Sequence, residues 1–401
     1  MSKNIAIIGG GISGIVTGIK LAKNRNNIIN IYEKNDDILK GSPYCHLHAG
    51  GFLYPEISLK DSQILLNDSI LFATEFGDCI EYRPTIIAYN INSKYNTSEL
   101  IFKCKAIKMS YINSKCYILG EPDKFYAIYE KSDIEYYKKC GKMPYKDNPS
   151  RIYHDKYVEN FCNILDDINK IKYPFISVCE PGINQDKLEL KLRNELKKYN
   201  NIRIFSGKEV DFDELKKCSE YNCIINASGK DMFNINEDEK YEFKSSWIIN
   251  MPLIINNFPE IAIIGERETK NGMIQITPLS SQIFQIHCMT SESTIINTYN
   301  KKEIQTDKNN YKIYNLSYEE INKRGIVAIK EISKYFPIFY LSKVKGARYG
   351  VQRIPYDSKL KRVSYVNVIK EANEMYIDII TLKACSIISL SNTIIEKVYS
   401  I

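Results

Sequence analysis

"NIAIIGGGISGIVTGIKLAKNRNNIINIYEKN", residues 4–35, contains two apolar runs separated by a glycine cluster and a helical segment. The run Ile5–Ile8 predicts a strand buried on both faces, because it is continuously apolar. The glycines after it predict a turn into a helix, and residues 28–32 predict a second strand. This order of strand, glycine turn, helix and strand predicts an α/β fold with a dinucleotide-binding βαβ unit.

The glycine spacing Gly9-x-Gly11-x-x-Gly14 gives each glycine a physical role. Gly9 permits the tight turn, Gly11 lets the backbone approach a pyrophosphate, and Gly14 lets the helix pack closely on the strand. The phosphates are expected at the helix N-terminus, where unpaired N–H groups and the helix dipole favour negative charge. Ile12 and Ser13 lie inside this motif and belong to the predicted site.

An acidic residue, Glu33, ends the second predicted strand about twenty residues after the glycines, where a carboxylate accepts hydrogen bonds from a ribose diol. The same charge repels a 2'-phosphate, so FAD or NAD is expected rather than NADP. No second G-x-G-x-x-G follows, which disfavours a separate NAD(P)H domain.

The length of 401 residues predicts two domains, because single cores stop growing at about 250 to 300 residues. No window approaches the ~18 consecutive apolar residues of a membrane span, and the N-terminus lacks the pattern of a signal peptide, so we expect a cytoplasmic protein without a transmembrane segment. The net charge of +7 is dispersed, which gives no indication of nucleic-acid binding. Eleven scattered cysteines without a C-x-x-C pair indicate no disulfide framework.

Later segments continue the same βα pattern. A helix is predicted over residues 185–198, and a strand over 202–205 leads to Val210. A further apolar strand, 223–225, ends in Ala227-Ser228-Gly229, and small residues there let a cofactor approach the backbone. The βα system at residues 1–40 therefore resumes at 180–230.

These ordered features resemble the FAD-dependent superfamily of D-amino-acid oxidase, glycine oxidase and monomeric sarcosine oxidase, in particular a bacterial subset with "HxxAGG-x-LYPEIS" and "GMxQxTP" stretches. The resemblance spans most of the chain. It rests on the opening glycine motif with Glu33, on Gly41-Ser42…Ala49-Gly50-Gly51 and "NASG", and on the C-terminal "KGARYGVQRIPYD" and "DIITLKACSIISLSNTIIEKV".

The resemblance implies a Rossmann-type, glutathione-reductase-like FAD domain made of residues 1–80, 175–235 and 335–401. Residues 81–174 and 236–334 are expected to form an interleaved α+β substrate domain on a mainly antiparallel sheet. FAD is the implied cofactor and no metal is expected. The implied FAD-binding residues are Gly9, Gly11, Ile12, Ser13, Gly14, Glu33, Lys34, Ser42, His48, Ala49, Gly50, Gly51, Val210, Ala227, Ser228, Gly229, Gly350, Lys383, Ala384 and Cys385.

Two predicted strands of the substrate domain carry polar residues in alternation. Gln275 and Thr277 share one face of "GMIQITP", and Gln285 and His287 share one face of "FQIHCMT". These residues either line a substrate cavity above the flavin or face solvent. Residues 130–160 are too polar for a core and end in a predicted amphipathic helix. We expect a solvated surface insertion there, and the alternative is a mobile cover over the site.

Two residues are candidates for catalysis. Arg353 is the candidate anchor for a substrate carboxylate, because guanidinium binds carboxylate bidentately; the alternative is a surface or interdomain ion pair. His287 is the candidate base or hydrogen-bond donor near pH 7, and the alternative is a structural histidine. Arg348 and Tyr349 are lesser candidates in the same C-terminal segment as Arg353.

The stretch "SPYCHLHAGGFLYPE", residues 42–56, places Cys45, His46 and His48 within four positions. A metal site is disfavoured, because so short a segment supplies at most a strained subset of ligands. Small residues on both sides instead indicate a main chain that passes close to the isoalloxazine ring. Covalent attachment of the flavin through His48 stays open.

Three functions remain open from the sequence. The first is oxidation of a small amino acid or amine by hydride transfer to flavin N5, with reoxidation by oxygen or another acceptor. The second is an FAD-dependent 2-hydroxy-acid (malate-like):quinone oxidoreductase, and the third is a non-redox protein of the flavin fold. The sequence does not distinguish oxygen, a quinone or a carrier protein as the electron acceptor.

Overall fold

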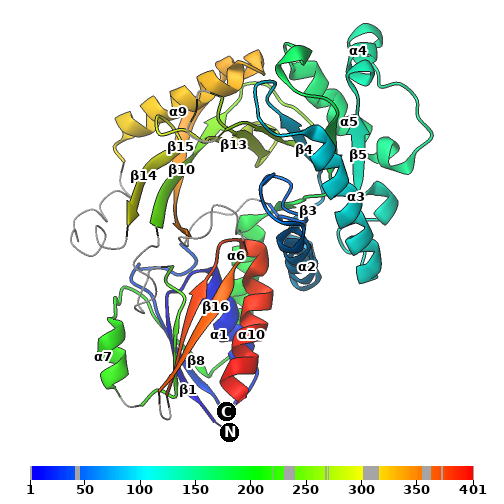
Figure 1. Cartoon of the computed structure of the whole chain (residues 1–401). Coiled ribbons are helices and arrows are strands. Elements are labelled where there is room, and N and C mark those ends of the chain that lie inside the picture. The colour runs from blue at the N-terminus through cyan, green and yellow to red at the C-terminus, as the bar shows by residue number, and fades with distance from the viewer. Residues whose placement is uncertain are drawn as a thin grey trace.

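The computed structural model describes residues 2–40, 46–218, 220–229, 240–266, 269, 271–300, 316–354, 363–371 and 374–400, with only the backbone at 240–241, 296–300 and 351–354. Two large sheets with helices packed on them make up most of the described structure (Figure 1). The N- and C-termini lie together at the end of the smaller sheet that points away from the larger one. The helices are α1 (Ile12–Ala22), α2 (Leu59–Phe76), α3 (Thr97–Ser114), α4 (Lys131–Cys140), α5 (Pro149–Ile164), α6 (Gln185–Leu196), α7 (Phe212–Lys217), α9 (Tyr318–Ser333) and α10 (Ile387–Tyr399).

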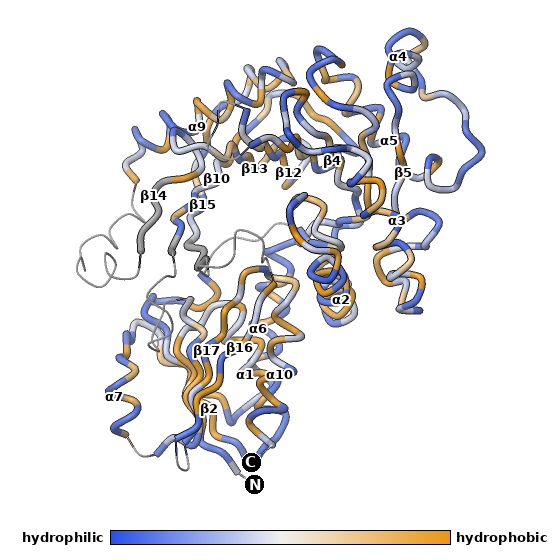
Figure 2. Tube along the Cα trace, in the orientation of Figure 1, coloured by the Kyte–Doolittle hydropathy of each residue, from blue (hydrophilic) through white to orange (hydrophobic). Residues whose placement is uncertain are grey.

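The smaller sheet contains the predicted βαβ unit. Its strands are parallel except for the edge strand β16, which runs antiparallel to β17. Figure 2 shows that β2 is largely hydrophobic, as expected of a strand with helices over the sheet. In spatial order the six strands are β16 (Tyr365–Glu371), β17 (Glu374–Ile380), β9 (Cys223–Asn226), β1 (Asn4–Ile8), β2 (Ile28–Tyr32) and β8 (Ile202–Phe205).

Helices α1 and α10 lie side by side against this sheet (Figure 1). Thr17 and Ser391 share a hydrogen bond of 3.0 Å between them. Helix α1 packs closely on the strands because a Cβ on Gly18 would lie 2.9 Å from Ile31 Cδ1. The last helix of the chain therefore supports the first.

The larger sheet is mainly antiparallel, as predicted; β4 and β11 form a parallel pair. Its apolar face packs on α9 and α5 in a second core around Trp247, Phe284 and Phe336. In spatial order the strands are β14 (Ile295–Asn300), β10 (Lys240–Asn250), β13 (Ile283–Cys288), β12 (Ile274–Pro278), β11 (Glu260–Ile264), β4 (Thr85–Tyr89), β6 (Phe175–Val178) and β5 (Tyr126–Tyr129), and β15 (Lys343–Ile354) also pairs with β10; β3 (Ile80–Glu81) and β7 (Gly182–Ile183) form a separate pair.

Two of the predicted domain boundaries differ from the sheet topology. Strand β6 begins at residue 175 but pairs with β4 and β5 in the larger sheet. Strand β15, predicted to belong to the FAD domain, pairs with β10 over nearly its whole length, with one register shift at Ile248/Ile249. The segment "KVKGARYGVQRI" contains glycines and charged residues that are typical of a loop. It forms a strand because its backbone pairs with β10, about a hundred residues earlier in the chain.

The prediction of a solvated insertion at residues 130–160 is wrong. Ile134, Val158 and Phe161 are fully buried in the second core. Arg151 is buried as well, because its guanidinium lies 2.9 Å from Asp133 Oδ2. The amphipathic helix predicted at the end of this segment is present as α5, and its apolar face is buried although the segment as a whole is polar.

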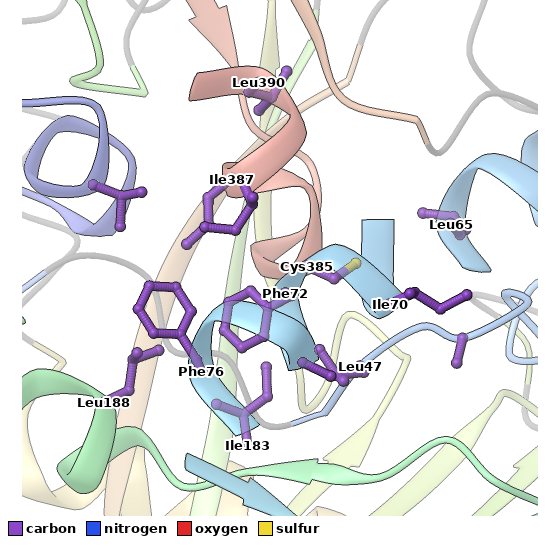
Figure 3. Close-up of a cluster of buried hydrophobic side chains, with 14 of the residues drawn as sticks. Leu47, Leu65, Ile70, Phe72, Phe76, Ile183, Leu188, Cys385, Ile387 and Leu390 are labelled. Carbon is purple, nitrogen blue, oxygen red and sulfur yellow. The ribbon is translucent and has the colours of Figure 1, made fainter. Parts of the chain in front are cut away.

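A cluster of buried side chains joins α2, α6, α10 and the segment after residue 46 (Figure 3). Leu47, Phe72, Cys385 and Ile387 belong to this cluster. It therefore holds the 46–51 segment beside the last turn of the chain, at residues 381–386.

Candidate active site between the two sheets

The glycine turn leaves open space at one position only. Gly9 has a φ of +103°, and a Cβ there would lie 2.7 Å from Ser228 Cα. A Cβ on Gly14 would lie 2.0 Å from Gly9 O, whereas one on Gly11 would meet nothing within 4 Å. Gly11 is also the N-cap residue of α1 and has no side chain to cap it. The turn therefore has the shape and the unpaired N–H groups of a phosphate cradle.

Glu33 lies at the end of β2, as predicted, and is buried. Its Oε2 accepts a hydrogen bond of 2.7 Å from Gly10 N, and its Oε1 accepts one of 2.8 Å from Asn35 N. The carboxylate thus joins the strand end to the glycine turn. Lys34, next in the chain, is exposed.

Three strand ends meet beside this turn. Ala227 N donates to Ile8 O at 2.8 Å, which joins β9 to β1. Ser228 Oγ donates to Asn226 Oδ1 at 2.7 Å, and Asn226 Nδ2 donates to Asp378 Oδ1 at 2.8 Å. Gly229 follows with a φ of +73°. Val210 lies in an apolar cluster with Ala6, Ile8, Tyr32 and Tyr376, among others.

The last turn of the chain reaches the same region. Thr381 Oγ1 lies 2.9 Å from Ser13 Oγ, at the start of α1. Lys383 Nζ donates to Tyr54 OH and lies 4.2 Å from the centre of the Tyr54 ring. Ala384 is partly buried, and burial raises the pKa of the Cys385 thiol to about 12. The structure thus brings the glycine turn, the Tyr54 region and the C-terminal turn together.

The segment from His46 to Gly51 is fixed by backbone bonds. Leu47 N donates to Pro181 O at 2.9 Å, and Gly50 N donates to His48 O at 2.7 Å. Gly50 and Gly51 have φ values of +125° and +61°, which glycine tolerates best. Ala49 is fully buried. Ser42 and Cys45 lie outside the described residues.

Lys103 holds this segment from α3. Its Nζ donates to Gly51 O at 3.0 Å and to Tyr54 O at 3.1 Å, and burial lowers its pKa to about 8.

Lys103→Met is expected to destabilise the protein by about 2 to 3 kcal/mol, because two carbonyls lose their donor. Urea unfolding measures this. Lys105→Met, an exposed change on the same helix, is the control; equal stability of the two variants would contradict the contact.

A buried charge cluster lies between this segment and the larger sheet. Glu260 is fully buried at the start of β11, with Oε1 2.9 Å from His46 Nδ1 and Oε2 2.9 Å from Arg83 Nη1. Gln275 Nε2 donates to Glu260 Oε1 at 2.5 Å. Burial raises the pKa of Glu260, but its interactions with His46, Arg83 and Gln275 outweigh burial and hold that pKa at about 2. Glu260 is therefore a carboxylate at neutral pH.

A second buried carboxyl, Glu180, behaves in the opposite way. It is fully buried, it accepts a hydrogen bond of 3.3 Å from Phe52 N, and burial raises its pKa from 4.5 to about 7. Between pH 4.5 and about pH 7, Glu180 keeps its proton in the folded protein, whereas the unfolded chain has released it. The free energy of unfolding therefore falls as the pH rises through this range. The expected loss from pH 4.5 to 8 is about 3 kcal/mol.

Glu180→Gln is expected to remove this pH dependence and to be more stable than the wild type at pH 8, because the amide oxygen still accepts from Phe52 N. Denaturation at pH 5 and pH 8 measures the difference. Glu121→Gln, at an exposed position, is the control. The expectation fails if wild type and Glu180→Gln lose the same stability between these pH values.

The polar face of the larger sheet turns toward this cluster. Gln275 and His287 are opposite each other on β12 and β13. Gln275, Thr277 and Gln285 are buried, so the alternative that they face solvent is wrong. His287 Nδ1 is buried and has no hydrogen-bond partner among the described residues. Burial lowers the pKa of His287 to about 4, which leaves it a weak base, neutral at pH 7.

Arg348 crosses from the larger sheet to the smaller one. It is half-buried on β15, and its Nη1 donates to Gln285 Oε1 at 3.5 Å and to Gln185 Oε1, in the first turn of α6, at 3.2 Å. Both acceptors are neutral, and the ion pairs among the described residues do not include Arg348. Gly350 is partly buried two residues further along β15. The backbone of Arg353 pairs with Tyr241, and its side chain lies outside the described residues.

Sequence reasoning missed Arg83, Lys103, Glu180 and Glu260. The available signal was a single carboxylate at the edge of an apolar strand, in "VCEPG" and in "PEIAIIGE". Such an acid requires a buried partner, but the partners come from distant segments.

Across the described ranges, no group of three or more His, Cys, Asp or Glu residues could hold a metal ion. Nor is any helix there long and apolar enough to cross a membrane.

No protein-family model matches the sequence, and neither does any curated protein. Solved structures match the whole chain. Glycine oxidase from Geobacillus kaustophilus has a TM-score of 0.63 at 12% identity, covering 100% of this chain and 95% of that one. L-proline dehydrogenase from P. horikoshii has a TM-score of 0.62 at 12% identity, covering 100% and 94%. This chain has their fold.

A third match is the glycerol-3-phosphate dehydrogenase from Bacillus halodurans complexed with FAD. It has a TM-score of 0.58 at 11% identity, and the match covers 100% of this chain and 64% of that one. The fold implied by the resemblance, a Rossmann-type domain with an interleaved second sheet, is therefore confirmed.

Proposed function

We propose that this protein is an FAD-dependent oxidoreductase that oxidises a small amino acid or a related amine carrying a carboxylate. The six-stranded sheet would hold FAD, and the nine-stranded sheet would cover the substrate. Two of the structural neighbours described above are named as oxidising glycine or proline. The observation that carries the proposal is Arg348, a half-buried cation between the larger sheet and α6 whose side-chain partners among the described residues are neutral.

The residues present fit FAD. The open side of Gly11 would admit a pyrophosphate, and the uncapped N-terminus of α1 would favour its charge. Glu33 directly follows β2, where the dinucleotide-binding unit places an acid for the ribose. The 46–51 segment and the C-terminal turn at Lys383 would face the isoalloxazine. Bound FAD supplies an acceptor for the hydride equivalent that leaves the substrate carbon.

Arg348 would bind the substrate carboxylate. A guanidinium forms two parallel hydrogen bonds with a carboxylate, and Gln185 and Gln285 orient this one without neutralising it. A partly buried charge is more stable with a counter-charge, which the substrate would bring. Arg348 is thus a better candidate than Arg353, whose side chain has no described environment.

Lys383 would serve the cofactor. Its ammonium group is fixed against Tyr54 at the C-terminal turn. A fixed positive charge beside the flavin stabilises the negative charge that develops on reduction.

The second candidate substrate is a 2-hydroxy acid, because the same guanidinium would bind its carboxylate. An amino acid and a hydroxy acid differ in the group that must lose a proton during oxidation. A panel of both classes therefore distinguishes the two functions, and the acceptor is found by reoxidising the reduced protein with oxygen or a quinone.

The test is anaerobic titration of FAD-loaded protein with amino acids, N-methyl amino acids and 2-hydroxy acids. Loss of the 450 nm flavin absorbance with amino acids is the expected result. Bleaching only by hydroxy acids would favour the second function, and failure to bind FAD would refute both.

Acid precipitation of the yellow protein shows whether FAD is attached covalently through His48. A yellow supernatant means that it is not.

A further inference from the structure

Three side chains form a hydrogen-bonded line from the larger sheet to the 46–51 segment. Glu260 Oε1 lies 2.9 Å from His46 Nδ1, and His46 Nε2 lies 3.1 Å from His48 Nδ1. The two imidazole rings meet edge to face, with centroids 4.2 Å apart. His46 therefore uses a different ring nitrogen for each of these two neighbours, as a proton relay requires.

Burial changes along this line. Glu260 is fully buried, His46 is 5% exposed, and His48 is partly exposed. The His48 ring lies 5.3 Å from the ring of Tyr54, which Lys383 contacts. The line thus runs from a buried carboxylate to an imidazole at the proposed flavin and substrate site.

The geometry permits two states that differ by one proton. In the first, His48 Nδ1–H donates to His46 Nε2, His46 Nδ1–H donates to Glu260, and His48 Nε2 carries a lone pair. In the second, a proton has bonded to His48 Nε2, the Nδ1 proton of His48 has moved to His46 Nε2, and the positive charge lies on His46. That charge is adjacent to the Glu260 carboxylate, which stabilises it.

Neighbouring charges set the balance between the states. Arg83 lies 2.9 Å from Glu260 and opposes a second positive charge, while Glu180, once ionised, favours one. Among the described residues, the other titratable groups near the line include Lys103, Lys383, His287, Tyr54 and Cys385. The two lysines oppose the added charge, His287 is neutral at pH 7, and burial raises the pKa of the Cys385 thiol, which keeps it neutral.

We propose that Glu260, His46 and His48 form a proton relay that takes the proton which a substrate ammonium group must lose before its carbon is oxidised. The inference rests on the proposed function. The substrate N–H bond breaks, the proton bonds to His48 Nε2, and the electron pair stays on the amine nitrogen. Bound FAD would supply the acceptor for the hydride that the substrate carbon then loses, and the substrate would leave as the iminium ion. His48 is the catalytic residue, and His46 and Glu260 are positioning residues.

The first test needs no substrate. The chain has four histidines, so ¹⁵N-histidine NMR follows each ring separately. His46 and His48 are expected to titrate together as one proton, and His46→Gln is expected to make His48 titrate alone. His154, held in the second core by Ser177 Oγ at 2.7 Å, is the internal reference that stays unchanged.

If His46→Gln does not fold, His48→Gln gives the reciprocal measurement at His46, because His48 is partly exposed. Independent titration of His46 and His48 in the wild type would overturn the relay. So would an unchanged titration of the remaining histidine in either variant.

The second test uses FAD-loaded protein and an amino acid that bleaches it. His48→Gln is expected to lower kcat/KM at pH 7 by about 10²- to 10³-fold, as for loss of a general base. The loss should shrink to less than about 10-fold above the pKa of the substrate amine, because the substrate then arrives without the proton. Lys105→Gln should match the wild type at every pH.

A loss in His48→Gln that is equal at all pH values would refute the proton transfer and leave His48 a structural residue. Failure of every amine to reduce the flavin would instead refute the proposed function. In that case the NMR titration still decides whether the three residues share a proton.

Discussion

Gly11→Ala is expected to fold normally and to bind FAD about 100-fold more weakly, a difference of ~2.7 kcal/mol. The added methyl group meets no protein atom within 4 Å, and the φ of −71° suits alanine, so the folded state tolerates it. The cost of alanine at an N-cap is about 1 kcal/mol or less. The same methyl group would occupy the space through which a pyrophosphate approaches the backbone. Equilibrium dialysis of FAD against apoprotein measures the change.

Gly14→Ala is the matched control, because its Cβ would lie 2.0 Å from Gly9 O. We expect this variant to lose more than about 4 kcal/mol of stability, since backbone atoms must move. The pair separates a cofactor defect from a folding defect three residues away. Unchanged FAD affinity in Gly11→Ala would place the phosphates elsewhere.

Arg348→Met is expected to lower kcat/KM for the amino-acid substrate about 10³-fold, as when one partner of a partly buried ion pair is removed. The effect should appear mainly in KM, because the guanidinium binds the carboxylate before and during the reaction. Steady-state kinetics with the substrate found by flavin bleaching measures it. FAD content and the melting temperature should remain close to wild type, since the two partners of Arg348 are neutral amides.

Arg25→Met is the control for a lost charge, because Arg25 lies far from the site and packs on Tyr199, 4.7 Å from its ring centre. Arg353→Met compares the anchor chosen from the sequence with the one chosen from the structure. A large loss in Arg353→Met together with full activity in Arg348→Met would reverse the assignment.

The nucleotide half of the molecule could be predicted from sequence because its signals are local. A buried strand, three spaced glycines and a strand-end acid lie within 30 residues, and each constrains the next. Ala227, Ser228 and Gly229 are a local signal of the same kind. They directly follow the apolar strand β9, so a close approach of a cofactor to the backbone there could be predicted from the sequence.

The other half could not be predicted in the same way, because its chemistry depends on distant pairs. Glu260, His46 and Arg83 are unremarkable separately, and only the meeting of β11 with the segment after residue 46 makes a charge cluster. Strand β15 is similar, since its regular pairing exists only against β10. Residues 130–160 show that mean polarity does not reveal which side of a helix is buried.

The contact of α1 with α10 has a consequence for synthesis of the chain. Thr17 and Ser391 are separated by 374 positions, so the N-terminal helix emerges from the ribosome long before its partner exists. At about 5 to 20 residues per second the delay is roughly 20 to 75 s. During that time the apolar surface destined for α10 is open to chaperones and to other nascent chains. Growth temperature and chaperone supply should therefore affect the yield of folded protein.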